Sequence, residues 1–99
     1  MKIIPYGRHF IDSNDIRSVT KALKQEKITS GKEVLKFEKR LTNFFGSKFA
    51  TVCNSGTSAL FLAFSSINLK KKDNIIMPAI NFVASYNVAK LFGASVFLA

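Results

Sequence analysis

Apolar residues in the first half of the chain recur at the spacing of an amphipathic helix. Asp12 stands directly before this pattern, where its carboxylate can accept hydrogen bonds from the first amides of a helix. The apolar positions lie three or four residues apart and so fall on one side of the helix: Ile16, Val19 and Leu23. The pattern predicts a first helix that begins after Asp12 and ends near Gln25.

A second amphipathic helix is predicted over residues 32–45, after a connection at residues 27–31. Its apolar side chains again share one face: Val34, Phe37, Leu41 and Phe44. Gly46 should end this helix, because glycine readily adopts the positive φ angle that is common after a last turn. We therefore expect a helical N-terminal segment over residues 1–46.

The second half of the chain changes to short β-prone runs that alternate with apolar helices. Strands are predicted at residues 49–53, 75–77 and 95–99, with helices over 57–67 and 82–92. The helix over 57–67 is apolar nearly all round, so we expect it to be buried on most sides. Because strands alternate with helices, the fold class is α/β, with a mostly parallel sheet and flanking helices.

Residues 47–99 are predicted to be the start of an α/β domain. The last predicted strand runs to Ala99 with no cap or polar tail after it, so we expect the sequence to be cut from a longer one. The 99 residues would suffice for one small domain, and hydrophobic residues at 47% could supply its core. Most of the ten phenylalanines lie at positions with a buried pattern.

The formal net charge of +9 favours anionic partners in general. The one basic cluster, Lys70–Lys72, lies beside a polar connection and is interpreted as a solvated loop. Exposed aromatics interleaved with basic residues, the pattern of nucleic-acid modules, are not expected here.

His9 has no partner at metal-ligand spacing, and no metal site is predicted. A lone cysteine and the lack of a long apolar run or leader favour a cytoplasmic protein without a membrane span; Cys53 is expected to be a buried thiol.

The loop at residues 54–58 follows a predicted strand, where α/β sheets bind their ligands. Gly56 permits close approach of the backbone, and hydroxyls flank it at Ser55, Thr57 and Ser58. With the free amides of a helix N-terminus, this loop can form a phosphate cradle. Ser55 or Thr57 can also simply cap the helix, and the pattern leaves both interpretations open.

A second loop at residues 78–82 follows the next predicted strand. Phe82 could lie flat on a planar ring, although an aromatic residue at a helix start is more often part of a core. We expect the two loops to lie at the same end of one sheet.

Several motifs, in order over nearly the whole chain, resemble those of the DegT/StrS sugar aminotransferases. Ile4–Arg8, the Ile11–Asp12 pair and Ile28–Gly31 are similar to the opening of that family. Asn54–Leu60 resembles its cofactor-phosphate motif, and Pro78–Ser85 resembles its ring-stacking segment. The Pro-Tyr-Gly-Arg opening most resembles members that aminate a UDP-linked 4-keto sugar on the way to pseudaminic acid. The resemblance implies the N-terminal part of the large domain of a fold-type-I aminotransferase that uses pyridoxal 5′-phosphate.

The resemblance also implies roles for individual residues. Gly56, Thr57 and Ser58 would hold the phosphate of pyridoxal 5′-phosphate. Phe82 would stack on the pyridine ring. The residues implied for the substrate pocket are Tyr6, Glu26, Lys27, Ile28, Thr29 and the backbone of Gly56. The implied partners are a nucleotide-linked keto sugar, an amino donor such as glutamate, and a second subunit in a homodimer.

The lysine that binds the cofactor in this family lies well beyond position 99, so no catalytic residue is assigned and the chain alone is expected to be inactive. Neither Lys48 nor Lys90 occupies a matching position. Three alternatives remain open. The chain could belong to a dehydratase relative that has replaced the lysine, or it could be an inactive truncated remnant. It could also be a small basic nucleic-acid-binding protein, which would leave the ordered motifs unexplained.

Overall fold

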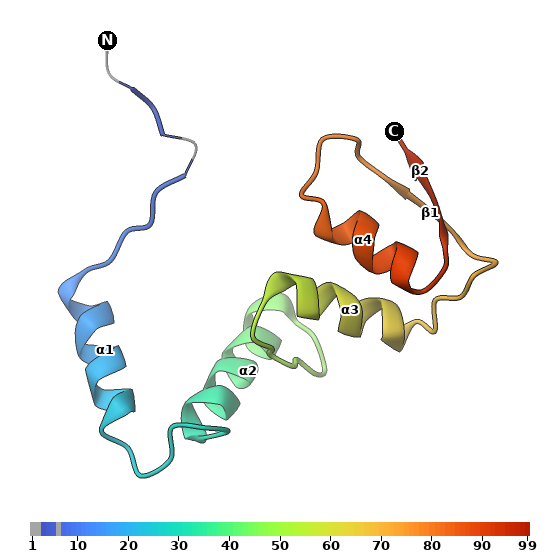
Figure 1. Ribbon diagram of the computed structural model, residues 1–99. Helices are drawn as coiled ribbons and strands as arrows, with labels where there is room; N and C mark the ends of the chain where they lie inside the picture. Colours follow the sequence, from blue (N-terminus) through green and yellow to red (C-terminus); the bar gives the residue numbers. More distant parts are fainter. Residues whose placement is uncertain (1–2, 6) are drawn as a thin grey trace. The chain divides into compact units, whose positions relative to one another are not determined.

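The computed structural model describes residues 3–5 and 7–99. The chain divides into two compact units, unit 1 (Met1–Ala50) and unit 2 (Thr51–Ala99). Unit 1 holds helices α1 and α2, and unit 2 holds α3, β1, α4 and β2 (Figure 1). The functional division into residues 1–46 and 47–99 stays a prediction.

Helix α1 (Ser13–Leu23) begins at the predicted cap. One carboxylate oxygen of Asp12 accepts hydrogen bonds from the amides of Asn14, at 2.7 Å, and Asp15, at 3.0 Å. In return the Asp15 carboxylate accepts a bond from the Asp12 amide at 3.0 Å, which completes a capping box. The backbone bonds from Asp15 and then Asn14 lower the pKa of Asp12. The helix ends at Leu23, slightly before the predicted end.

Helix α2 (Lys32–Phe45) has the predicted bounds. Gly46 adopts a φ of 63°, and its amide donates to the Thr42 carbonyl, so the predicted glycine stop is confirmed. No residue of α1 or α2 is buried. The apolar stripe of α2 is exposed, with Phe37 at 54% and Phe44 at 82% of their surface.

Unit 2 contains the expected parallel strands and covering helices. Strands β1 (Asn74–Met77) and β2 (Ser95–Leu98) pair in parallel. Helix α4 (Ala84–Leu91) connects them and packs against β2, while α3 (Gly56–Ser66) packs against α4 (Figure 1). The α/β class is confirmed, and α4 begins two residues later than predicted, at Ala84.

The small core of unit 2 is built around α4 and the sheet. Its side chains are 8% exposed or less: Leu69, Met77, Ala84, Val88, Ala89 and Ala94. Helix α3 contributes no buried residue, so the prediction that it is buried on most sides is wrong for this chain. Phe61 and Leu62 expose 46% and 47% of their surface. Helix α3 is apolar nearly all round, and α4 covers one side of it.

Three further expectations about residues 49–53 and the aromatic side chains are wrong. Residues 49–53 form no strand, because no other strand of the described residues pairs with them and a strand exists only in a ladder. The thiol of Cys53 is exposed and donates to the Ser55 carbonyl at 3.3 Å. None of the ten phenylalanines is buried. Burial of the Cys53 thiol and of the phenylalanine rings requires a second layer of packed elements. The described residues do not supply that layer.

Candidate functional site

The loop before α3 is held by hydrogen bonds between its own side chains. Ser55 is the N-cap, and its hydroxyl oxygen accepts the amide hydrogen of Ser58 at 3.1 Å. The Ser55 hydroxyl donates to the Ser58 hydroxyl oxygen at 3.0 Å. The Ser58 hydroxyl in turn donates to Asn54 Oδ1 at 2.8 Å. Ser55 therefore caps the helix, which was one of the two interpretations that the sequence left open.

The capping bonds leave two amides at the start of α3 free. Ser55 accepts the amide hydrogens of Ser58, through its hydroxyl oxygen, and of Ala59, through its carbonyl at 3.0 Å. Among the described residues, the amides of Gly56 and Thr57 have no acceptor. The first turn of α3 has no acidic residue, so nothing on the helix compensates the positive end of its dipole. The cap and an anion site are thus compatible, because they use different amides.

Gly56 is not required by the fold of this chain. A Cβ atom at this position would meet no atom within 4 Å, and its φ is not in the left-handed region. Neither close packing nor a strained turn explains the glycine. A ligand that approaches the backbone closely would explain it.

Phe82 lies on the same pocket as the start of α3. This pocket, of about 610 Å³, is lined by Gly56, Thr57, Ala59, Leu60, Ala63, Phe82 and Ala84. Phe82 exposes 76% of its surface, so it is not the core residue that its position more often indicates. The lining combines free backbone amides with an apolar wall and contains no titratable side chain. Such a pocket suits a flat ring that carries an anionic group.

The backbone of Phe82 is fixed by its polar neighbours. The Asn81 side chain accepts the Phe82 amide hydrogen at 2.7 Å and donates to the Ser85 hydroxyl at 3.0 Å. The Ser85 hydroxyl donates to the Phe82 carbonyl at 3.2 Å. This segment follows the carboxyl end of β1, as predicted, whereas the loop at residues 54–58 follows no strand.

The structure brings together three of the four residues predicted for the cofactor: Gly56, Thr57 and Phe82. Ser58 is half-buried and is not among the lining residues. Four apolar lining residues were missed by sequence reasoning: Ala59, Leu60, Ala63 and Ala84. Three of them follow Gly56 on α3 at spacings of three, four and seven, and this helical spacing was the available signal.

Two residues predicted for the substrate line a pocket in unit 1. Glu26 and Lys27 belong to a pocket of about 550 Å³ near the start of α2. Ile28, which is 71% exposed, and Thr29 are not among its lining residues. Tyr6 lies outside the described residues. Gly56 belongs to unit 2, whereas Glu26 and Lys27 belong to unit 1. That these residues share one substrate pocket therefore stays a prediction.

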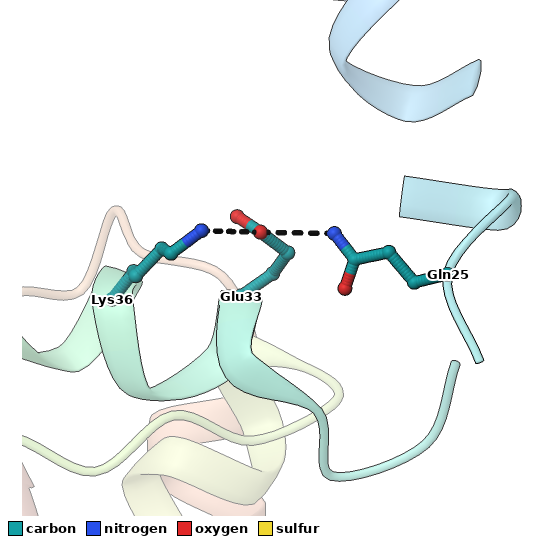
Figure 2. A network of polar contacts seen from close by, with 3 residues as sticks. All are labelled: Gln25, Glu33 and Lys36. Atoms are coloured by element: carbon teal, nitrogen blue, oxygen red, sulfur yellow. Dashed lines mark hydrogen bonds and ion pairs between the residues drawn. The ribbon is translucent and has the colours of Figure 1, made fainter. Parts of the chain in front are cut away.

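Glu33 connects the segment after α1 to the first turn of α2 (Figure 2). Its Oε1 atom accepts hydrogen bonds from Lys36 Nζ at 2.7 Å and from Gln25 Nε2 at 3.0 Å. These bonds, with that from Lys36 the larger influence, lower the pKa of Glu33. The ion pair is exposed to solvent, so its effect on stability is small.

The basic cluster and the other candidate chemistry add no second site. Lys70–Lys72 is exposed, as predicted for a solvated loop, and the Lys70 amide donates to Asp73 Oδ2 at 2.7 Å. Within residues 3–5 and 7–99, no group of three or more His, Cys, Asp and Glu side chains could hold a metal ion. No helix of the same residues has both the length and the apolar character needed to cross a bilayer.

Known sequences that resemble this chain include sugar aminotransferases. The sequence model of the DegT/DnrJ/EryC1/StrS aminotransferase family matches residues 9–99. A UDP-4-amino-4,6-dideoxy-N-acetyl-beta-L-altrosamine transaminase from Campylobacter jejuni is 44% identical over 94 residues, which are 95% of this chain and 25% of that protein. A GDP-perosamine synthase from Caulobacter vibrioides is 33% identical over 86% of this chain and 23% of its own length.

Solved structures of sugar-modifying enzymes also resemble the chain over nearly its whole length. PseC of Helicobacter pylori, an aminotransferase involved in the biosynthesis of pseudoaminic acid, superposes with a TM-score of 0.88 at 34% identity, over 99% of this chain and 27% of its own. A sugar aminotransferase from Streptococcus pneumoniae in its PLP form gives 0.86 at 28% identity, over 97% and 24%. An Escherichia coli GDP-4-keto-6-deoxy-D-mannose-3-dehydratase with bound PLP gives 0.83 at 28% identity, over 93% and 25%. The chain thus spans about a quarter of the length of each protein that it matches.

Proposed function

This chain belongs to the DegT/DnrJ/EryC1/StrS aminotransferase family, and we propose that it forms the cofactor-phosphate region of an enzyme that aminates a nucleotide-linked keto sugar. One observation carries the proposal: a single pocket joins the free amides of Gly56 and Thr57 to the exposed ring of Phe82. Because the chain spans 25% of its transaminase relative, the remaining machinery would come from the rest of a complete family chain.

Pyridoxal 5′-phosphate suits this pocket in charge and in shape. Its phosphate would accept hydrogen bonds from the amides of Gly56 and Thr57 and from the Thr57 hydroxyl. Its ring would lie among apolar side chains, with Phe82 as the aromatic contact. When bound, the cofactor supplies an electron-withdrawing ring that stabilises negative charge during amino transfer. This chain's part is to bind and orient it.

Ser58 remains a proposed phosphate ligand, but its hydroxyl must first break a hydrogen bond within the loop. Its hydroxyl donates to Asn54 Oδ1 and its amide to the Ser55 hydroxyl oxygen. To reach a phosphate, the Ser58 hydroxyl would exchange Asn54 for the anion and keep its amide in the cap. Ser58 would then contribute to binding less than Thr57, whose hydroxyl has no acceptor among the described residues.

The proposed acceptor is a keto carbon on a UDP-linked sugar, and the proposed donor is glutamate. The name of the relative from Campylobacter jejuni supports the UDP-linked substrate. The involvement of PseC of Helicobacter pylori in the biosynthesis of pseudoaminic acid supports a product on that route. The pocket of unit 1 gives an anionic substrate limited support: its three lysines, Lys27, Lys32 and Lys36, outnumber its two acidic residues, Glu26 and Glu33, by one charge. We further propose a homodimer, and a cytoplasmic location in which the free thiol of Cys53 would stay reduced.

Sugar dehydration is the second candidate, because the dehydratase from Escherichia coli shares this part of the fold. The pocket residues bind the cofactor phosphate in either reaction and do not discriminate. The two functions differ in product, since amination adds nitrogen to the sugar and dehydration removes a hydroxyl without adding nitrogen. The 44% identity to a transaminase favours amination.

The cofactor site can be tested by NMR on an enzyme in which this chain, isotopically labelled, replaces the matching quarter of the Campylobacter jejuni relative. Pyridoxal 5′-phosphate should shift the amide signals of Gly56 and Thr57 and the ring signals of Phe82. Inorganic phosphate should shift the two amides alone, and pyridoxal without phosphate should shift them much less. Shifts centred on Lys27 and Lys32 instead, or none at Gly56 and Thr57, would contradict the proposed cradle.

The reaction itself requires a complete enzyme. A hybrid in which this chain replaces the matching quarter of the Campylobacter jejuni relative supplies one. With glutamate and a UDP-linked 4-keto sugar, the hybrid should release a sugar that has gained nitrogen. A product that has lost a hydroxyl without gaining nitrogen would favour dehydration.

A further inference from the structure

The backbone of Phe82 is held on both sides by side chains rather than by other backbone groups. Asn81 Oδ1 accepts the Phe82 amide hydrogen at 2.7 Å, and the Ser85 hydroxyl donates to the Phe82 carbonyl at 3.2 Å. Asn81 Nδ2 donates to the Ser85 hydroxyl oxygen at 3.0 Å and so links the two side chains. Among the described residues, no backbone group bonds to the Phe82 amide or carbonyl. Asn81 and Ser85, here called the Phe82 clamp, therefore supply the hydrogen bonds of this residue.

The clamp does not serve the helix that follows it. Asparagine and serine near the start of a helix commonly accept hydrogen bonds from its first amides, as Ser55 does for α3. The N-cap of α4 is Val83, and no side chain caps this helix. Helix capping thus does not explain the bonds of Asn81 and Ser85, which are directed to Phe82 instead.

The clamp is anchored to the core of unit 2. Ser85 is half-buried in the first turn of α4, and its hydroxyl oxygen lies 3.7 Å from the Met77 sulfur. Met77 is the last residue of β1 and is 7% exposed. Because peptide groups are planar, bonds on both sides of the Phe82 Cα atom also restrict the direction of its Cα–Cβ bond. The clamp therefore sets where the Phe82 ring starts relative to the end of β1.

The ring of Phe82 has little other support. It is 76% exposed, and no other aromatic ring within the part of the chain that the structure describes packs against it. Neither Asn81 nor Ser85 lines the pocket that Phe82 shares with Gly56 and Thr57. The clamp can therefore influence a ligand in this pocket through the position of the ring.

We propose that Asn81 and Ser85 are positioning residues for pyridoxal 5′-phosphate, because they hold the Phe82 ring in place before the cofactor binds. The inference rests on the proposed function, in which this ring contacts the cofactor. A ring that is already in place spares the ligand the entropic cost of ordering it. The amides of Gly56 and Thr57 bind the phosphate without the ring, so the clamp should affect the cofactor and leave inorganic phosphate unaffected.

The test measures the affinity of the hybrid apoenzyme for pyridoxal phosphate and, by competition, for inorganic phosphate. Asn81→Ala and Ser85→Ala should each weaken cofactor binding about three- to tenfold and change phosphate binding less than about twofold. Ser85→Thr keeps the hydroxyl and is the matched control, with cofactor affinity expected within about twofold of the parent. In a Phe82→Leu background, Asn81→Ala should have no further effect, because the clamp acts through the ring.

The outcomes separate this inference from the proposed function. Parent-like cofactor affinity in Asn81→Ala and Ser85→Ala, with a loss in Phe82→Leu, would overturn the positioning role and leave the proposed function intact. Equal losses for cofactor and phosphate, or additive losses for Asn81→Ala and Phe82→Leu, would also overturn the positioning role. Parent-like affinity in Phe82→Leu would contradict the ring contact of the proposed function, and the positioning role with it. Asn81 is exposed, so Asn81→Ala decides the matter even if Ser85→Ala does not fold.

Discussion

The start of α3 uses different atoms for helix capping and for the proposed anion binding. The side chain and carbonyl of Ser55 satisfy the amides of Ser58 and Ala59, and the amides of Gly56 and Thr57 stay free. The sequence predicted a cap or a cradle as alternatives, because residue types alone do not say which amides are used. The hydrogen-bond geometry shows that the same loop can do both.

Replacing Thr57 with valine should weaken cofactor binding without loosening the helix. The change keeps the side-chain shape and the amide but removes the hydroxyl that would donate to the phosphate. A charge-assisted hydrogen bond contributes about 1.5–3 kcal/mol, so affinity should fall by roughly ten- to a hundredfold. Titration of the hybrid apoenzyme with pyridoxal phosphate measures this, and Thr57→Ser is the control that keeps the hydroxyl. Equal affinity in Thr57→Val and the parent would remove this hydroxyl from the site.

Gly56→Ala separates the requirement of the fold from that of the ligand. A Cβ atom here meets no atom within 4 Å, and alanine is the better helix former, so the helical content of the chain should stay the same or rise. The added methyl group would stand where a phosphate must approach the backbone, and cofactor affinity should therefore fall. Circular dichroism and cofactor titration check the two parts separately. A variant that binds pyridoxal phosphate as well as the parent would show that the glycine is not needed for close approach.

Among the secondary-structure elements, those defined by local signals were predicted best. Asp12 begins α1 and Gly46 ends α2 through bonds within a few residues, so residue types at fixed offsets sufficed. Residues 49–53 have the composition of a strand, yet no strand forms because no partner strand is available. Ladder pairing depends on distant residues, which a local pattern cannot supply.

The cap of α1 should make the start of this helix sensitive to acid. Hydrogen bonds to the carboxylate lower the pKa of Asp12 below its ordinary value of 3.8 in the folded chain. A group whose pKa is depressed by folding stabilises the fold above its unfolded pKa, and this contribution is lost as the pH falls through the folded pKa. We therefore expect the protection of the Asn14 and Asp15 amides against hydrogen exchange to be constant above about pH 5 and to decrease below about pH 4.

Asp12→Asn supplies the matched control, because asparagine caps helices about as well as aspartate and does not titrate. Its amide protection at Asn14 should lose most of the acid dependence. An identical pH profile in the parent and in Asp12→Asn would mean that another group controls the end of the helix.

At the scale of the whole chain, the order of elements was predictable and their burial was not. Alternation of helices and strands gave the α/β class, and the motifs gave the residues that the Phe82 pocket brings together. The predictions of a buried α3, a buried Cys53 and buried phenylalanines failed for a common reason. Hydrophobic patterning marks side chains that are suited to a core, but burial requires a partner layer, and the residues described here supply only part of one.

The last prediction concerns the 99-residue chain studied alone. Among residues 3–5 and 7–99, 25 large apolar side chains are more than a third exposed, including Ile76, Phe61 and Phe44. The isolated chain should therefore bind a hydrophobic dye strongly and be poorly soluble despite its net charge of +9. Among the described residues, no lysine lines the Phe82 pocket where the cofactor would be held. Reduction with borohydride after addition of pyridoxal phosphate should label several surface lysines weakly, as mapped by mass spectrometry. Stoichiometric labelling of one lysine, together with amino transfer to a nucleotide-linked keto sugar, would show that this region suffices for catalysis and that the division of labour proposed here is wrong.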